Sequence, residues 1–202
     1  MKRLHLMRHG QTLYNLQKLV QGRCDSPLTD RGVEEARAAG EWLAAQGIRF
    51  DRICTSPLGR ALNTAHTVRD VLRSYAADPL ALPAVEIVDG LMERSYGIYE
   101  EGPQVDVPAD VWDPGEELVA QGGEGSIALR ARMVSTLEGL MRDDDVEELL
   151  AVSHGSATLQ FKKAWEHLAR CPQDVALGNC CILVFDFDPT TGEFSNTAIV
   201  NR

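Results

Sequence analysis

The chain alternates short apolar segments with longer amphipathic ones, and this order restricts its fold more than any other feature. It begins with a short apolar strand that ends at Arg8. A helical pattern over 29–46 is followed by a buried strand over 50–55 and a second helix over 56–75, with Ser56 as its cap. The order strand, helix, strand, helix predicts a parallel sheet with helices on both faces.

The second half continues this pattern after one long irregular segment. Residues 90–125 are rich in glycine, proline and acidic residues and show no periodicity, so we expect a lid-like excursion over the sheet. The other predicted elements are strands at 85–88, 149–153, 180–187 and 194–200, the last two as a hairpin, and helices at 126–142 and from after Gly155 to about 169. A length of 202 residues with 44% hydrophobic composition suits one core, which predicts a single domain over 1–202.

The formal net charge of −10 restricts the partners of the protein. Nucleic acid and anionic membranes are not expected as partners, because such a charge repels them. A phosphate site would have to be a local basic pocket within an acidic surface. No apolar run approaches the length of a membrane span, and no signal peptide is readable. Five cysteines at irregular spacing fit neither a disulfide framework nor a zinc pattern, so a reducing cytoplasm is the expected location.

Two strands that lie far apart in the sequence both end in a His-Gly pair. The pairs occur in Arg8-His9-Gly10 and Ser153-His154-Gly155. The carboxyl ends of parallel strands meet at one edge of a sheet, where ligands bind in open α/β folds. If both strands are central and parallel, the imidazoles of His9 and His154 meet there beside Arg8. This arrangement predicts an anion held by Arg8 and attacked by His9.

Two further side chains are candidates for the same pocket. Arg60 lies near the start of a predicted helix, where free N–H groups and a guanidinium favour a bound anion. Glu93 lies where the chain leaves the sheet, and its carboxyl group could protonate a leaving alkoxide. Taken alone, Arg60 is better explained as an exposed helical arginine, and Glu93 also fits a surface ion pair with Arg94.

Three other patterns point to different chemistry. Cys54 and Arg60 have the spacing of cysteine-dependent phosphatases, but Pro57 lacks an N–H to hold phosphate. Because Cys54 also falls within an apolar strand, we interpret it as a buried core thiol. Residues 123–128 resemble a dinucleotide-binding fingerprint, but no predicted strand precedes them. A histidine zinc site would lack a completing carboxylate or thiol; its ligands would be His5, His9 and His154.

Together and in this order, the motifs resemble those of the histidine phosphatase superfamily, which has the phosphoglycerate mutase-like fold. The matching stretches are RHGQTLYN at 8–15, QGRCDSPLTDRG at 21–32, SPLGRALNTA at 56–65, LMERSYGIYE at 91–100, SHG at 153–155 and GNC at 178–180. They span most of the chain, so the set is specific although a single RHG is not. The resemblance implies a three-layer α/β/α sandwich around a mostly parallel mixed sheet, and a reaction that needs no metal or other cofactor.

The resemblance also implies roles for individual residues. His9 would be the nucleophile that becomes phosphorylated, and Glu93 would be the proton donor. Together with His9, the phosphate pocket would be formed by Arg8, Arg60 and His154. The positions that contact phosphate or substrate in relatives are Asn15, Gln21, Gly22 and Gly155.

The excursion bears on which activity of this family to expect. Residues 95–129 contain no Lys or Arg, whereas glycolytic mutase relatives carry basic residues there that hold the substrate carboxylate. Its acidic residues would disfavour a second anionic group or a bisphosphate cofactor; they are Glu100, Glu101, Asp106, Asp110, Asp113, Glu116, Glu117 and Glu124. We therefore expect a phosphatase for small phosphorylated substrates with a neutral or cationic body, on which Trp112 could stack.

Two alternatives to this hypothesis stay open. One is phosphoryl transfer of the phosphoglycerate mutase type, and the other is a non-catalytic phospholigand-binding module on the same fold. The motif at 123–126 also departs from relatives, because Gly125 interrupts the usual Gly-Glu-Ser. The roles of Glu124 and Ser126 are therefore open at this point.

Overall fold

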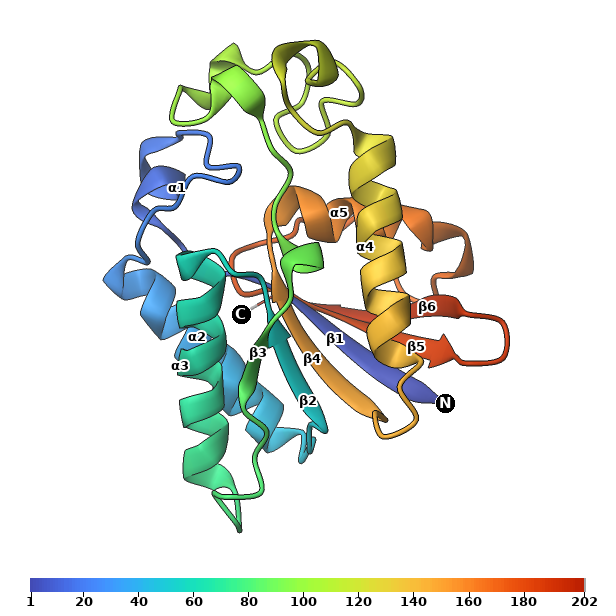
Figure 1. The fold of residues 1–202 in the computed structure, drawn as a ribbon. Helices are drawn as coiled ribbons and strands as arrows, with labels where there is room; N and C mark the ends of the chain where they lie inside the picture. The colour runs from blue at the N-terminus through green and yellow to red at the C-terminus, as the bar shows by residue number, and fades with distance from the viewer. Residues whose placement is uncertain (202) are drawn as a thin grey trace.

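A six-stranded mixed sheet forms the centre of the fold in the computed structural model, which describes residues 1–201 (Figure 1). Its strands are β1 (Lys2–Arg8), β2 (Arg52–Thr55), β3 (Val85–Ile87), β4 (Glu148–Ser153), β5 (Ile182–Asp188) and β6 (Glu193–Val200). Their order across the sheet is β3-β2-β4-β1-β5-β6. The first four in this order run parallel to one another, β5 runs antiparallel to β1, and β6 runs antiparallel to β5. The predicted mostly parallel mixed sheet is therefore confirmed.

Helices cover both faces of this sheet (Figure 1). On one face lie α2 (Asp30–Ala45) and α3 (Gly59–Tyr75), and on the other lie α4 (Ser126–Met141) and α5 (Gly155–Ala164). Successive strand residues point to opposite faces, so Leu4 and Leu6 of β1 pack in the core cluster with α4 and α5, whereas Met7 packs with α2 and α3. The predicted α/β/α sandwich is confirmed.

Two local predictions were wrong, and one short helix was not predicted. The helix α3 begins at Gly59 with Leu58 in the cap position, so Ser56 does not cap it. The helix predicted to reach 169 ends at Ala164 and is followed by a separate 3-10 turn. A short helix, α1 (Leu13–Gln17), was not predicted, because five residues are too few to show a helical period.

Residues 90–125 form the predicted excursion and are called the lid below. The lid lies at the top of the molecule in Figure 1 and contains several short 3-10 turns. Three of its residues, Tyr96, Val107 and Leu118, form a small apolar cluster with Val20, which lies outside the lid. The backbone N–H of Val20 donates to the carbonyl of Gly102 at 2.9 Å, which joins the lid to the loop that follows α1. Within residues 1–201, no helix is long and apolar enough to cross a membrane.

Candidate active site

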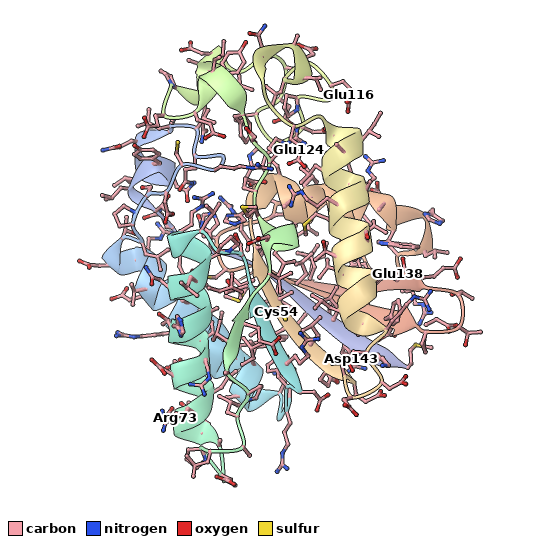
Figure 2. The ribbon with its side chains drawn as sticks, viewed as in Figure 1. Cys54, Arg73, Glu116, Glu124, Glu138 and Asp143 are labelled. Carbon is pink, nitrogen blue, oxygen red and sulfur yellow. The ribbon has the colours of Figure 1, made fainter. Side chains whose placement is uncertain are left out.

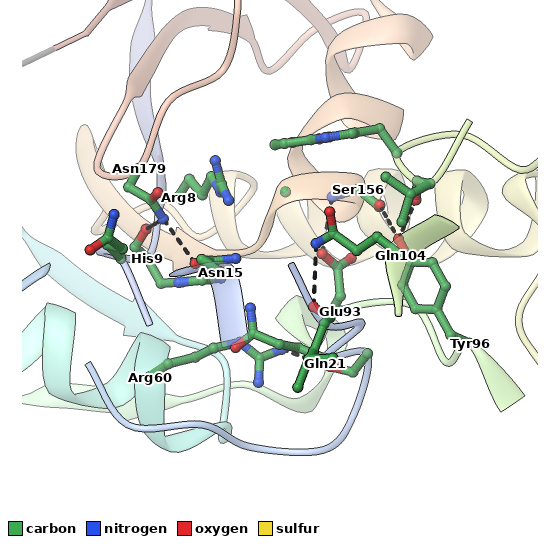
Figure 3. Close-up of a pocket in the computed structure, with 16 residues that line it drawn as sticks. Arg8, His9, Asn15, Gln21, Arg60, Glu93, Tyr96, Gln104, Ser156 and Asn179 are labelled. Atoms are coloured by element: carbon green, nitrogen blue, oxygen red, sulfur yellow. Dashed lines mark hydrogen bonds between the residues drawn. The ribbon is translucent and has the colours of Figure 1, made fainter. Parts of the chain in front are cut away.

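A cavity of about 280 Å³ lies at the carboxyl edge of the central strands. Here β1 and β4 end side by side, with Arg8 paired to Ser153. In Figure 3, His9 and Asn179 lie on one side of this cavity, and Tyr96 and Gln104 lie on the other. Eight of the nine residues named from the sequence line it: Arg8, His9, Asn15, Gln21, Gly22, Arg60, Glu93 and Gly155.

His9 is held in one orientation directly after β1. Its Nδ1 lies 2.7 Å from the carbonyl oxygen of Gly10. A carbonyl oxygen only accepts, so Nδ1 carries the proton and Nε2 keeps its lone pair. Burial, together with the charges of Arg60 and Arg8, lowers the pKa of His9 well below its usual value of 6.5. The imidazole is therefore neutral at pH 7, as a nucleophile must be.

Arg8 reaches the cavity from the last position of β1. Its Nη1 donates to the carbonyl of Leu177 at 2.9 Å, and its guanidinium carbon lies 4.7 Å from the ring centre of Trp112. The Nε of Arg8 is buried and has no hydrogen-bond partner among residues 1–201. Because Arg8 lines the cavity, its guanidinium places a fixed positive charge in the cavity wall, which favours a bound anion.

Arg60 enters the cavity from the first turn of α3. Its Nη2 donates to the carbonyl of Gly22 and its Nη1 to that of Cys24, both at 2.7 Å. The guanidinium is almost fully buried, and its Nε also lacks a partner within the described part of the chain. Gly22 has a φ of +54°, and a Cβ there would lie 2.4 Å from a carboxylate oxygen of Glu100. The loop that orients Arg60 therefore requires glycine at this position.

Glu93 is held by the amino terminus of α5. Its carboxylate accepts hydrogen bonds from the backbone N–H groups of Ser156 at 3.0 Å, Ala157 at 2.9 Å and Arg94 at 2.9 Å. The first N–H groups of a helix lack intrahelical partners, so an acidic side chain satisfies them. Because α5 directly follows β4, the carboxylate is fixed at the edge of the sheet where His9 lies.

His154 is the one predicted site residue that does not line the cavity. It is fully buried beside His9, with 5.2 Å between the ring centroids. Its Nε2 lies 2.7 Å from the hydroxyl of Ser56, whereas its Nδ1 has no partner among residues 1–201. Burial, followed by the charge of Arg60, lowers the pKa of His154 well below its usual value. His154 is therefore neutral and held by the residue that was predicted to cap α3.

The lid supplies an uncharged part of the cavity wall. Of its residues there, Trp112 was singled out from the sequence, but Tyr96, Gln104 and Val111 were not. The hydroxyl of Tyr96 donates to the Val111 carbonyl at 2.6 Å and lies 2.7 Å from the hydroxyl of Ser156, which links the lid to α5. The sequence carries no signal for these three positions, because the lid has no periodic pattern. The other unforeseen lining residues are Gln11, Leu19, Ser156 and Asn179.

Apart from Glu93, the acidic residues of the lid do not line the cavity, and the repulsion of anions by them stays a prediction. Among the described lining residues, Glu93 is the one carboxylate. Glu100 instead accepts backbone N–H groups of Arg23, Cys24 and Tyr96. Its hydrogen-bonding partners in the protein therefore occupy the carboxylate of Glu100.

The alternative chemistries have less support in the structure. Cys54 is confirmed as a core thiol, since it is fully buried on β2 and burial raises its pKa to about 11 (Figure 2). His5, a member of the zinc set considered above, lies 2.8 Å from a carboxylate oxygen of Glu148. Within residues 1–201, no group of three or more His, Cys, Asp or Glu side chains is arranged to hold a metal ion.

Comparison with known proteins agrees with the resemblance seen in the motifs. A family model described as the histidine phosphatase superfamily (branch 1) matches residues 4–199. A broad-specificity phosphatase of Saccharomyces cerevisiae is 30% identical over 95% of this chain and 82% of its own length. A 2,3-bisphosphoglycerate-dependent phosphoglycerate mutase of a Methylobacterium species is 35% identical over 76% of each chain. The structure of a phosphoserine phosphatase from Entamoeba histolytica, in complex with 3-phosphoglyceric acid, has a TM-score of 0.76 and 25% identity over 100% of this chain and 98% of its own. The chain therefore belongs to the histidine phosphatase superfamily.

Proposed function

We propose that this protein is a metal-independent phosphatase that hydrolyses small phosphomonoesters through a phosphohistidine on His9. The observation that carries the proposal is a neutral His9, anchored through Nδ1, in a cavity that is also lined by Arg8 and Arg60. The cavity is open, which favours an enzyme over a binding module with a blocked site. All five cysteines are free thiols, which suits a cytoplasmic enzyme.

In the first step, Nε2 of His9 attacks phosphorus in line, and the bond from phosphorus to the leaving oxygen breaks. Glu93 takes up a proton as the substrate binds and gives it to that oxygen, so the product alcohol leaves neutral. Arg8 and Arg60 neutralise charge on the phosphoryl oxygens, and preorganised donors of this kind contribute about 3 kcal/mol each. His154 does not line the cavity but packs beside the nucleophile, with 5.2 Å between its ring centroid and that of His9.

In the second step, water hydrolyses the phosphohistidine. The carboxylate of Glu93 takes a proton from the water as its oxygen attacks phosphorus, and the bond from phosphorus to Nε2 breaks. Inorganic phosphate leaves, His9 is neutral again, and Glu93 has regained its proton. No other reactant is required.

The charge of the cavity favours hydrolysis over a mutase reaction, although relatives of both kinds exist. A mutase must also hold the carboxylate of its substrate and a bisphosphate cofactor, which calls for further cationic side chains. Among the described lining residues, the Lys and Arg side chains are Arg8 and Arg60 alone. The remaining polar lining consists mainly of amides and hydroxyls: Gln11, Asn15, Gln21, Tyr96, Gln104, Ser156 and Asn179.

Turnover of 4-nitrophenyl phosphate by the wild type and two variants tests the proposal. We expect His9→Ala to lose activity and Cys54→Ala to keep it, and we expect the wild type to form an acid-labile, base-stable phosphoprotein. The reverse pattern for the two variants would indicate a cysteine mechanism instead. Exchange of phosphate between the carbons of phosphoglycerate, with bisphosphate present and faster than hydrolysis, would establish a mutase.

A further inference from the structure

Trp112 is fixed inside the cavity before any substrate binds. Its ring centre lies 4.7 Å from the guanidinium carbon of Arg8, in the range of a cation–π contact. A Cβ built on Gly155 would lie 2.7 Å from Cζ3 of the ring, so the ring rests directly on the backbone of Gly155. A ring held from two sides loses little further freedom when a ligand packs against it.

Apart from Arg8, which holds the reacting phosphate, the lining around Trp112 is uncharged and partly apolar. Val111 and Leu19 line the same cavity, and the ring of Tyr96 joins them. The hydroxyl of Tyr96 is already engaged by the Val111 carbonyl and by Ser156. What Tyr96 offers a ligand is therefore its ring. Gln104 adds an amide to this wall.

This lining discriminates between leaving groups by their charge and shape. A carboxylate or second phosphate on the substrate would lose its hydration here without a further cation to replace it, because Arg8 and Arg60 already bind the reacting phosphate. A flat apolar group would instead be removed from water and could pack against a preorganised aromatic surface. The gain from such aromatic packing is a factor of roughly 3–10 in binding.

We propose that Trp112 is a specificity-determining residue, against which the leaving group of the substrate packs. The substrates selected are monophosphate esters whose leaving group is uncharged and has a flat apolar face. This inference rests on the proposed phosphatase function, because it concerns the same cavity. Trp112 acts on the leaving group, whereas Arg8 and Arg60 act on the phosphate that all such substrates share.

The test compares kcat/KM for phenyl phosphate and cyclohexyl phosphate, which have rings of similar size but different flatness. Each variant is compared with the wild type on the same substrate, so the intrinsic reactivity of each ester cancels. We expect Trp112→Leu to lower kcat/KM about tenfold for the phenyl ester and at most about threefold for the cyclohexyl ester. For the phenyl ester, kcat/KM of Trp112→Phe should lie between that of Trp112→Leu and that of the wild type. Gly155→Ala should give the same pattern with the tryptophan retained, because its Cβ displaces the ring.

Val105→Ala is the matched control, because Val105 is 89% exposed on the lid and does not line the cavity. Val105→Ala should leave kcat/KM unchanged for both esters. Equal losses on both esters in Trp112→Leu would overturn the inference, as would a wild type that prefers 3-phosphoglycerate to phenyl phosphate.

A binding measurement separates failure of this inference from failure of the proposed function. Calorimetry with phenylphosphonate and cyclohexylphosphonate requires no turnover. The inference predicts that the wild type binds the phenyl compound more tightly and that Trp112→Leu loses this preference. Without that preference the inference is wrong, even if the wild type hydrolyses both esters through His9. With it, the inference stands even if turnover does not depend on His9.

Discussion

Arg132 of α4 forms hydrogen bonds with both ends of the lid, close to Glu93. Its Nε and Nη2 donate to the carboxylate of Glu124 at 2.9 and 2.6 Å. Its Nη1 donates to the carbonyls of Gly90 and Met92 at 2.8 and 2.9 Å. Figure 2 shows Glu124 where the lid leads into α4. The role left open for Glu124 by the sequence is thus an ion pair with Arg132, and we predict that this pair positions Glu93.

The perturbations are Glu124→Gln and Arg132→Lys, each of which removes the two-pronged contact without creating a large cavity. The side chains of the pair are 14% and 21% exposed, so solvent screens the interaction only in part. Hydrogen bonds to charged groups contribute about 1.5–3 kcal/mol, and the partial exposure reduces the expected loss to about 1–2 kcal/mol. For a chain of this size, that loss lowers Tm by about 2–8 °C.

The effect on activity should depend on the leaving group. Cyclohexanol is a poor leaving group and needs the proton from Glu93, whereas 4-nitrophenol leaves readily without it. A displaced Glu93 should therefore lower kcat/KM about tenfold for cyclohexyl phosphate and less than about threefold for 4-nitrophenyl phosphate. The double variant should lose less stability than the sum of the losses in the two single variants, because both substitutions break the same interaction.

Glu138→Gln is the matched control for Glu124→Gln. Glu138 also pairs with an arginine of the same helical segment, but its side chain is 33% exposed and that of Arg142 is 47% exposed. Glu138→Gln should lower the free energy of unfolding by less than about 0.5 kcal/mol and leave kcat/KM unchanged for both substrates. Equal losses on the two substrates in Glu124→Gln, or a lower Tm with unchanged kcat/KM, would refute the positioning role.

Further predictions concern Cys54 and the two histidines. Cys54→Ala should keep wild-type kcat/KM and lose about 1 kcal/mol of stability in urea unfolding, whereas a tenfold loss of activity would contradict a core role. Because the pKa of His9 lies well below 6.5, kcat/KM corrected for substrate ionisation should fall only at pH values under 6.5. A midpoint above that value would mean that His9 is not the titrating nucleophile. Stability should also decrease as the pH falls below 6.5, because the unfolded chain binds protons that buried His9 and His154 do not. Replacing His154 by Asn should reduce this slope by about 1.4 kcal/mol per pH unit, measured by urea unfolding at several pH values.

The sequence by itself determined the sheet and the residues at its carboxyl edge. Alternating strands and helices predict parallel central strands, and β1 and β4 are indeed neighbours with their His-Gly pairs at the same edge. This inference works because parallel pairing follows from chain order and because side-chain direction follows from the period of a strand. The motif set then predicted that Arg8, His9, Arg60 and Glu93 share one cavity, which they do.

Only the tertiary structure decided the directions of the lid side chains and the charge states of the histidines. An irregular segment has no period from which an inward face can be read, so distant partners set its side-chain directions. Glu124 does not line the cavity because its carboxylate is bound by Arg132. Trp112 does line the cavity because its ring packs against Arg8 and Gly155. Burial likewise exists only in the folded chain, and it is burial that keeps His9 neutral and ready to attack.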